Sequence, residues 1–254
     1  MRILLTNDDG CASPGIILLA KALRKAGHRV FVLAPDSDRS GVSHSISFLG
    51  GPCRLTEIEK DTWSCSGTPV DCVVLALLGG IPELKVVDDD GGIPPDLLIS
   101  GINRGANIGT DVLYSGTAAA ARQGSLIGIP SLALSLLEGD SWHWEMAASF
   151  SVERLEEMRQ FWKADTFVNV NIPNGAAAPL GLVPSFPSLR RYNDRIDRYE
   201  AWDGGRYCFA RAGEIGAEPE EGSDWDIVSK NQASMSAMFI HPVVLEEVRG
   251  RRGA

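Results

Sequence analysis

The chain has 254 residues, of which 44% are apolar, and this is enough for one large α/β domain with a sizeable core. Its formal net charge of -9 argues against binding to nucleic acid polymers or anionic membranes, which requires basic patches. No apolar run is long enough to span a membrane, no signal peptide is recognisable, and the five scattered cysteines lack metal-site spacing. We therefore expect a cytoplasmic protein with reduced thiols.

Short apolar runs alternate with helical patterns over the first 173 residues. Strands are expected at 2–6, 30–34, 45–59, 62–66, 96–100, 131–136 and 167–172. Helices are expected from Ser13 and Pro14 to near Gly27, from Thr68 and Pro69 to Gly79, over 117–126, and as one long amphipathic helix over 141–162. Such alternation implies parallel pairing through right-handed crossovers, so we predict a Rossmann-like, doubly wound, mostly parallel sheet in a domain of residues 1–173.

The pattern changes in residues 174–254, which we expect to form a hairpin-rich extension packed on the same domain. Asp203-Gly204-Gly205 reads as the turn of a β-hairpin, and the acidic stretch 213–222 as an exposed loop. A last strand is expected at 234–240 and a short helix at 243–249. Without a second core of its own, this extension is expected to dock on another subunit and to support a homodimer or homotetramer.

Polar, glycine-rich segments follow the predicted strands. Asp8, Asp9 and Gly10 follow the first strand, 35–41 follows the second, and 101–107 follows the strand at 96–100. Open parallel sheets bind ligands at the carboxyl ends of their strands, so these segments are expected to meet at one edge.

Asp8 and Asp9 are adjacent carboxylates that repel each other beside a low-dielectric interior, unless a cation offsets them. A hard divalent cation prefers oxygen ligands, and the side-chain oxygens of Ser40 and Asn103 would complete the set without adding charge. One aspartate alone would be read as an Asx-turn. The pair between an apolar strand and Gly10 favours a metal site.

The segment Ser115-Gly116-Thr117 opens an Ala-rich helix, whose free N–H groups and positive dipole end can hold a phosphate. Gly41 after Ser40 can form a similar nest of amides. The alternative for Ser115 is a plain helix cap. The run of arginines from Arg190 to Arg198 is interpreted as a solvated hairpin face or an inter-subunit contact rather than a phosphate clamp.

Several stretches of the sequence carry a resemblance to a known family: MRILLTNDDG at 1–10, SPGIILLAKAL at 13–23, VLAPDSDRSGVSHS at 32–45, SGTPVDCV at 66–73, PDLLISGINRGANIGTDVLYSGTAAAARQG at 95–124 and VNVNIP at 168–173. In these stretches the sequence resembles the stationary-phase survival protein SurE family of nucleotidases. The resemblance implies a Rossmann-like fold with C-terminal elements that mediate dimers or tetramers. It also implies metal-dependent release of phosphate from nucleoside 5′- or 3′-monophosphates, and from short polyphosphate in some members.

Carried over residue by residue, the resemblance implies metal ligands at Asp8, Asp9, Ser40 and Asn103, with one Mg²⁺ or Mn²⁺ per subunit. It implies phosphate contacts at Gly41, Asn107, Ser115, Gly116 and Thr117. Many members carry asparagine where this chain has His44, and the usual tail motif is replaced by Ser234-Met235-Ser236-Ala237-Met238. We therefore hypothesise that His44 contacts the substrate and protonates the leaving alkoxide; the alternative is that it hydrogen-bonds as asparagine would.

The predicted function is that of a metal-dependent phosphomonoesterase in which Asp9 orients or deprotonates the attacking water. A receiver domain would need a phospho-accepting aspartate where the strand ends in Ser100-Gly101-Ile102-Asn103, and a haloacid-dehalogenase-type phosphatase would need D-x-D-G-T. A nucleotide- and metal-binding regulatory module without turnover stays open, because binding and hydrolysis use the same groups. The preferred base and the choice of 5′ or 3′ position stay open as well.

Overall fold

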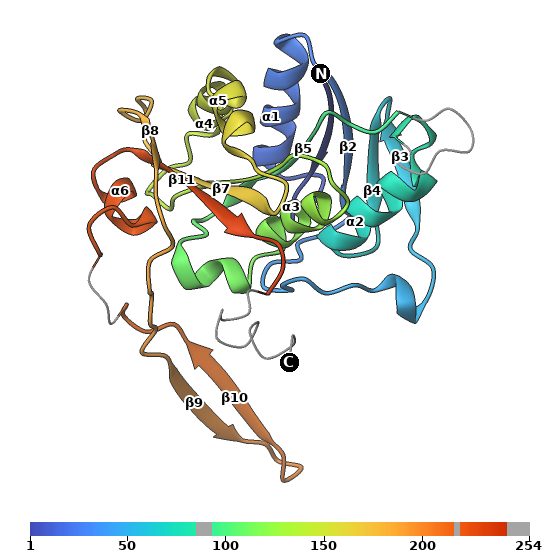
Figure 1. Ribbon diagram of the computed structural model, residues 1–254. Coiled ribbons are helices and arrows are strands. Elements are labelled where there is room, and N and C mark those ends of the chain that lie inside the picture. Colours follow the sequence, from blue (N-terminus) through green and yellow to red (C-terminus); the bar gives the residue numbers. More distant parts are fainter. Residues whose placement is uncertain (85–92, 216–218, 243–254) are drawn as a thin grey trace, which may run out of the picture.

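The structure, a computed structural model, describes residues 1–84, 93–215 and 219–242 and is built on a nine-stranded sheet (Figure 1). In spatial order its strands are β3 (Leu55–Glu59), β4 (Thr62–Cys65), β2 (Arg29–Pro35), β1 (Arg2–Thr6), β5 (Leu97–Arg104), β6 (Ser131–Leu136), β7 (Thr166–Ile172), β11 (Ala233–Phe239) and β8 (Leu182–Pro184). The strands from β4 to β7 are parallel, whereas β3 and β11 run antiparallel to their neighbours β4 and β7. The predicted mostly parallel α/β sheet is confirmed.

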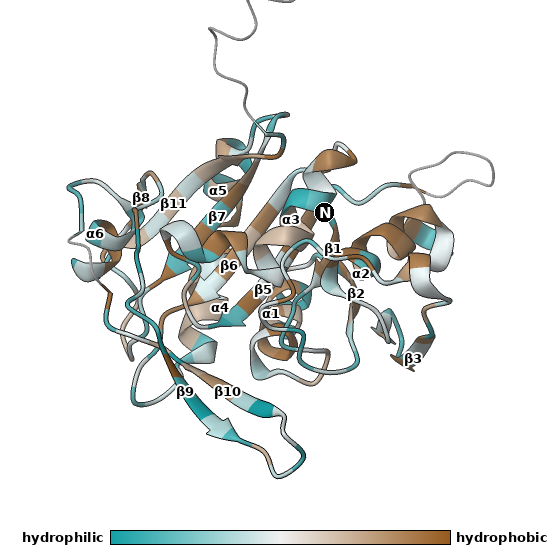
Figure 2. Ribbon diagram, turned by 90° about the horizontal axis from the view of Figure 1, so that it is seen from below, coloured by the Kyte–Doolittle hydropathy of each residue, from teal (hydrophilic) through white to brown (hydrophobic). Residues whose placement is uncertain are grey.

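Helices cover both faces of this sheet because its central strands are apolar on both sides (Figures 1 and 2). Along β1, Ile3 and Leu5 belong to the core under α1 (Pro14–Lys25), α4 (Trp144–Glu153) and α5 (Leu155–Phe161). Leu4 points the other way and belongs to the core under α2 (Pro69–Leu75) and α3 (Gly116–Leu126). This period of two places each strand between two hydrophobic layers.

The C-terminal residues return to the main sheet and also form a separate ribbon. Strands β8 and β11 extend the sheet beyond β7, and α6 (Asp224–Ser229) packs beside β11. The predicted hairpin is confirmed as β9 (Arg195–Glu200) and β10 (Arg206–Arg211), which project away from the body (Figure 1). No helix in the described part of the chain is both long and apolar enough to cross a membrane. The helix predicted at 243–249 lies outside the described residues.

Two predicted elements were wrong in extent, and one helix was not predicted. Only Leu55–Glu59 of the predicted strand 45–59 is extended, because the glycines before it support a 3₁₀ turn at Phe48–Gly50 and an irregular loop. The single helix predicted over 141–162 is two helices, interrupted at Arg154, whose φ of -100° and ψ of 7° are not helical. The interruption lets Leu155 and Met158 of α5 face the core. Helix α6 is too short to show an apolar period in the sequence.

The order of the strands places a crevice next to β1. From β1 the chain adds β2 and β4 on one side and then crosses to β5 on the other, so the carboxyl ends of β1 and β5 lie next to each other. Ligands bind at such a reversal in open α/β sheets because the loops on its two sides diverge.

Candidate active site

The turn after β1 is fixed by the buried side chain of Asn7. Its Nδ2 donates to the Gly10 carbonyl oxygen at 2.9 Å, and its Oδ1 accepts from the Gly10 N–H at 3.2 Å. Nδ2 also lies 3.2 Å from Ser13 Oγ, next to the start of α1. Asn7 therefore closes the turn onto Gly10, and the two aspartates between Asn7 and Gly10 lie at the strand end.

Asp8 is 3% exposed and faces the first turn of α3. Its Oδ2 accepts from the Thr117 N–H at 3.1 Å, and its Oδ1 accepts from Thr117 Oγ1 at 2.5 Å. A Cβ on Gly116 would lie 2.8 Å from the Asp8 Cβ, so glycine allows the helix to approach this closely. Burial raises the pKa of Asp8, and the hydrogen bonds from Thr117 oppose that rise.

Asp9 lies beside Arg104, the last residue of β5. Burial and then repulsion from Asp8 raise the pKa of Asp9 to about 6, while a hydrogen bond from the Arg104 N–H, at 3.1 Å from Asp9 Oδ2, lowers it. The Arg104 guanidinium stacks over the Trp142 ring at 5.2 Å, and Trp142 stacks on Trp144 at 5.1 Å. This stack holds one positive charge at the edge of an otherwise acidic site.

The two predicted neutral ligands come from neighbouring segments. Ser40 Oγ donates to Asp38 Oδ1 at 2.6 Å and leaves its lone pairs unused by that contact. Asn103 Nδ2 donates to the Gly105 carbonyl oxygen at 2.8 Å, which orients the amide and leaves Oδ1 as an acceptor. The register shift between Ser100 and Asn103 marks a bulge just before the site.

A cavity of about 260 Å³ brings most of the predicted residues together. It is lined by Asp8, Ser40, Gly41, Asn103, Arg104, Gly105, Ala106, Asn107, Asp111, Tyr114, Ser115 and Glu138. A neighbouring cavity of about 240 Å³ is lined by Asp9, Ser13, Pro14, Asp38, Ser40, Arg104 and Trp144. The two aspartates thus face adjoining cavities that share Ser40 and Arg104.

The donor chemistry fits a hard divalent cation. Burial raises the pKa of both carboxylates; repulsion from Asp38 adds to the rise for Asp8, and repulsion from Asp8 adds to it for Asp9. A cation bound between the two carboxylates would relieve both effects. The remaining predicted donors are a hydroxyl and an amide oxygen. Among the described residues no group of three or more His, Cys, Asp or Glu side chains is arranged to hold a metal, so the fit depends on Ser40 and Asn103.

Three predicted residues make contacts other than those expected. His44 does not line either cavity, and its Nε2 lies 3.0 Å from Gln123 Oε1 on α3. Asn107 lines the larger cavity, but its Nδ2 donates to Ser135 Oγ at 2.7 Å. Thr117 uses both its N–H and its hydroxyl on Asp8.

Several lining residues were not singled out from the sequence. Asp38, Arg104, Asp111, Tyr114 and Glu138 all contribute to the two cavities. All but Glu138 lie inside the stretches that resemble the SurE family, which is the signal that could have found them. Nothing in the sequence marks Glu138, which reaches the cavity only because β6 lies beside β5.

The comparisons with known proteins concern the family of the chain. The family described as "Survival protein SurE" matches residues 3–189. The chain belongs to the SurE family. A curated relative from Synechococcus elongatus, named 5′-nucleotidase SurE, is 40% identical over 252 residues, which is 94% of this chain and 93% of the relative. A relative of the same name from Xanthomonas campestris is 46% identical over 181 residues, and this match spans 70% of the chain and 66% of the relative.

The fold of the described residues is also that of a SurE protein. The crystal structure of the SurE protein from Aquifex aeolicus superposes with a TM-score of 0.82 at 33% identity and covers 99% of this chain and 100% of that chain. The similarity therefore includes the C-terminal residues beyond the region matched by the family.

Proposed function

We propose that this SurE protein is a divalent-metal-dependent phosphatase that releases phosphate from nucleoside 5′- or 3′-monophosphates and from short polyphosphate. One observation carries the proposal: Asp8, Asp9, Ser40 and Asn103 line two adjoining cavities at the carboxyl ends of β1 and β5, where the strand order reverses, next to the N-terminus of α3. Curated relatives named 5′-nucleotidase support the choice of substrate.

Asp8, Asp9, Ser40 and Asn103 would hold one Mg²⁺ or Mn²⁺ per subunit, and such an ion polarises a phosphate oxygen and lowers the pKa of a bound water. The phosphate would lie in the larger cavity, where Gly41 has a φ of 76° and can present its N–H. The N–H groups at the start of α3 add the positive end of its dipole. Asp9, whose metal-free pKa is about 6, is the group we assign to orient or deprotonate the water.

Phosphate release should be measured from all common nucleoside 5′- and 3′-monophosphates, first with a chelator and then after Mg²⁺, Mn²⁺ or Zn²⁺ is added back. We expect release only with Mg²⁺ or Mn²⁺, because all four donors are oxygens. Release should be greater with Mn²⁺, because it binds such ligands more tightly than Mg²⁺ and tolerates looser geometry. Asp8→Asn should lose about a hundredfold in kcat, since it removes an anionic ligand. Full activity in the chelated protein, or rescue by zinc alone, would refute the proposed metal site; nucleotide binding without any release would favour the regulatory module.

We also propose that the chain forms a homodimer or homotetramer through the β9–β10 hairpin. All residues of both strands except the half-buried Asp197 are exposed, and the hairpin carries the exposed side chains of Tyr199, Trp202, Tyr207 and Phe209. A two-stranded ribbon is marginally stable alone, and such an aromatic surface favours burial against another copy. Light scattering should give a multiple of the 27.3 kDa chain mass, which Phe209→Lys reduces and Ile58→Lys on β3 does not. A wild-type monomer at micromolar concentration would contradict the proposal.

The five cysteines carry free thiols. This is consistent with a reducing compartment such as the cytoplasm, which we propose as the site of action.

A further inference from the structure

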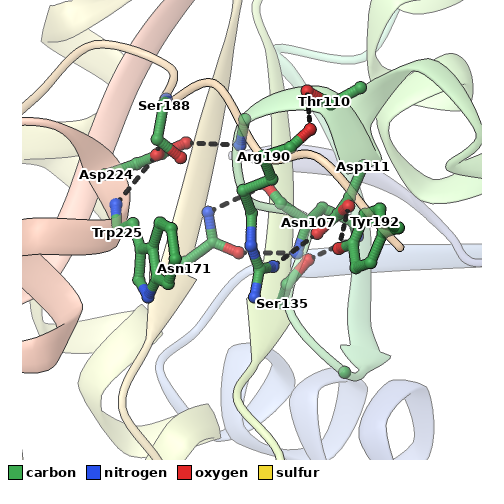
Figure 3. A network of polar contacts seen from close by, with 12 residues as sticks. Asn107, Thr110, Asp111, Ser135, Asn171, Ser188, Arg190, Tyr192, Asp224 and Trp225 are labelled. Carbon is green, nitrogen blue, oxygen red and sulfur yellow. Dashed lines mark hydrogen bonds and ion pairs between the residues drawn. The ribbon is translucent and has the colours of Figure 1, made fainter. Parts of the chain in front are cut away.

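One wall of the larger cavity carries a carboxylate that is already paired. Asp111, in the 3₁₀ turn η4 (Gly109–Leu113), lines this cavity. Its Oδ2 lies 2.6 Å from Arg190 Nη1 and its Oδ1 accepts from the Tyr192 hydroxyl at 2.5 Å (Figure 3). The side chains of Arg190 and Asp111 are only 14% and 18% exposed, so water screens their interaction weakly. Asp111 is thus neutralised by a residue from the C-terminal part of the chain.

Two aromatic rings also lie against the Arg190 guanidinium. It lies 5.1 Å from the Trp225 ring centroid and 5.8 Å from that of Tyr192 (Figure 3). Cation–π contacts of this kind restrict the orientation of an arginine. Arg190 is therefore oriented toward Asp111, before the hairpin begins at Arg195, and does not lie on the solvated hairpin face that was one of the two interpretations of this arginine run.

The backbone on both sides of this pair is fixed independently by Asp224, which is 1% exposed. Its Oδ2 accepts from the Gly109 N–H at 2.8 Å and its Oδ1 from the Ser188 N–H at 2.9 Å (Figure 3). Thr110 Oγ1 donates to the Arg190 carbonyl oxygen at 3.0 Å. These contacts join η4 to the segment around Arg190 without using the Arg190 side chain, so that side chain can be changed while the backbone stays in place.

The charges around the cavity explain why the pairing matters. Its walls carry the carboxylates of Asp8, Asp111 and Glu138 and one other cation, Arg104. A cation on Asp8 and Asp9 would offset those two groups only. Without Arg190, a phosphate in the cavity would face the full charge of Asp111, and a like charge several ångströms away in a half-buried site lowers affinity by roughly tenfold.

We propose that Arg190 is a positioning residue that sets the affinity of the site for phosphate by neutralising Asp111. It acts through Asp111 and does not touch the substrate. The inference rests on the phosphatase function proposed above.

The test compares wild type, Arg190→Ala, Asp111→Asn and the double variant. KM and kcat are measured with p-nitrophenyl phosphate, and inorganic phosphate is titrated calorimetrically in the presence of Mn²⁺. Arg190→Ala should raise KM and the phosphate Kd by about tenfold and change kcat by less than about twofold. Arg191→Ala, which removes the same charge from an exposed neighbour, is the matched control and should leave both constants unchanged.

A charge effect predicts two results that a structural defect would not give. Asp111→Asn should tighten phosphate by several-fold, because Arg190 is then uncompensated, and the double variant should return to within about twofold of wild type.

Each contrary result has its own meaning. A double variant as weak as Arg190→Ala, or an Arg190→Ala protein that behaves like Arg191→Ala, overturns the proposal. If Arg190→Ala does not fold, Asp111→Asn decides, and an unchanged phosphate affinity in that variant overturns the proposal. Absence of phosphate release by wild type that still binds phosphate refutes the proposed function alone, whereas absence of phosphate binding refutes both.

Discussion

Asp9→Asn should stabilise the chelated protein at neutral pH, although it removes a predicted metal ligand. The pKa of Asp9 is raised from 3.8 to about 6 by burial and by its neighbour Asp8. Below the unfolded value both states bind the proton, so the substitution changes the free energy of unfolding little. Between pH 3.8 and about 6 the unfolded state has lost the Asp9 proton while the folded state keeps it, so the free energy of unfolding of wild type falls as the pH rises. Above pH 6 both states are deprotonated, and the loss of stability has its full value.

The shift from 3.8 to about 6 corresponds to about 3 kcal/mol. Asp9 is partly exposed, and solvent screening reduces the expected effect to about 2 kcal/mol. For a chain of this size that is roughly 4–8 °C in Tm.

The assay is thermal unfolding of wild type and Asp9→Asn at several pH values between 4 and 8, with chelator and with saturating Mn²⁺. With chelator, the Tm difference in favour of Asp9→Asn should be near zero at pH 4 and grow to its full size above pH 7. Mn²⁺ should reverse the order, because only wild type keeps both anionic ligands. A chelated Asp9→Asn protein that is less stable than wild type at pH 7.5 would refute the assignment of Asp9 as a partly buried, destabilising charge.

Two further predictions concern single side chains. The His44 ring is hydrogen-bonded to Gln123 away from both cavities, so His44→Asn should change kcat by less than about threefold and keep the pH profile. If His44→Asn instead abolishes the alkaline limb of the pH profile for nucleotides but not for p-nitrophenyl phosphate, the result would support the acid role hypothesised from the sequence. Gly109→Ala should lower the free energy of unfolding by about 2–4 kcal/mol in urea, because Gly109 has a φ of 54° and a Cβ there would lie 2.0 Å from the Ser188 carbonyl oxygen. Gly128→Ala is the control: Gly128 has a φ of 86° and no atom within 4 Å of the added Cβ, so this variant should lose only about 1 kcal/mol in the free energy of unfolding. Equal losses in the two variants would argue against a tight contact at Gly109.

The parallel part of the sheet was predictable because its strands are continuous apolar runs. The runs at 2–6 and 131–136 coincide with β1 and β6, and Pro14 begins α1 as expected from its position after Ser13. The helix predicted over 141–162 failed because an apolar period continues through Arg154, where the backbone leaves the helix, and periodicity alone does not show such a break.

Within the site, the sequence predicted which segments meet but not which atoms they use. Asp8 and Ser115 line one cavity because both follow the sheet's carboxyl edge, which is a property of the topology. Arg190 does not line this cavity and bears on it only through its pairing with Asp111, 79 positions away in the sequence, which no local pattern encodes. The amide of Asn107 likewise turns to Ser135, since its orientation depends on the neighbouring strand.

The two edges of the nine-stranded sheet bear on how copies of this chain can associate. On one edge, β3 carries Glu57 and Glu59 and a register shift between them; on the other, β8 has three residues and ends in Pro184. Charges, irregular register, short length and proline all hinder the addition of a further strand from another molecule. The sheet itself is therefore a poor template for edge-to-edge aggregation, and the proposed association of copies would use surfaces outside it.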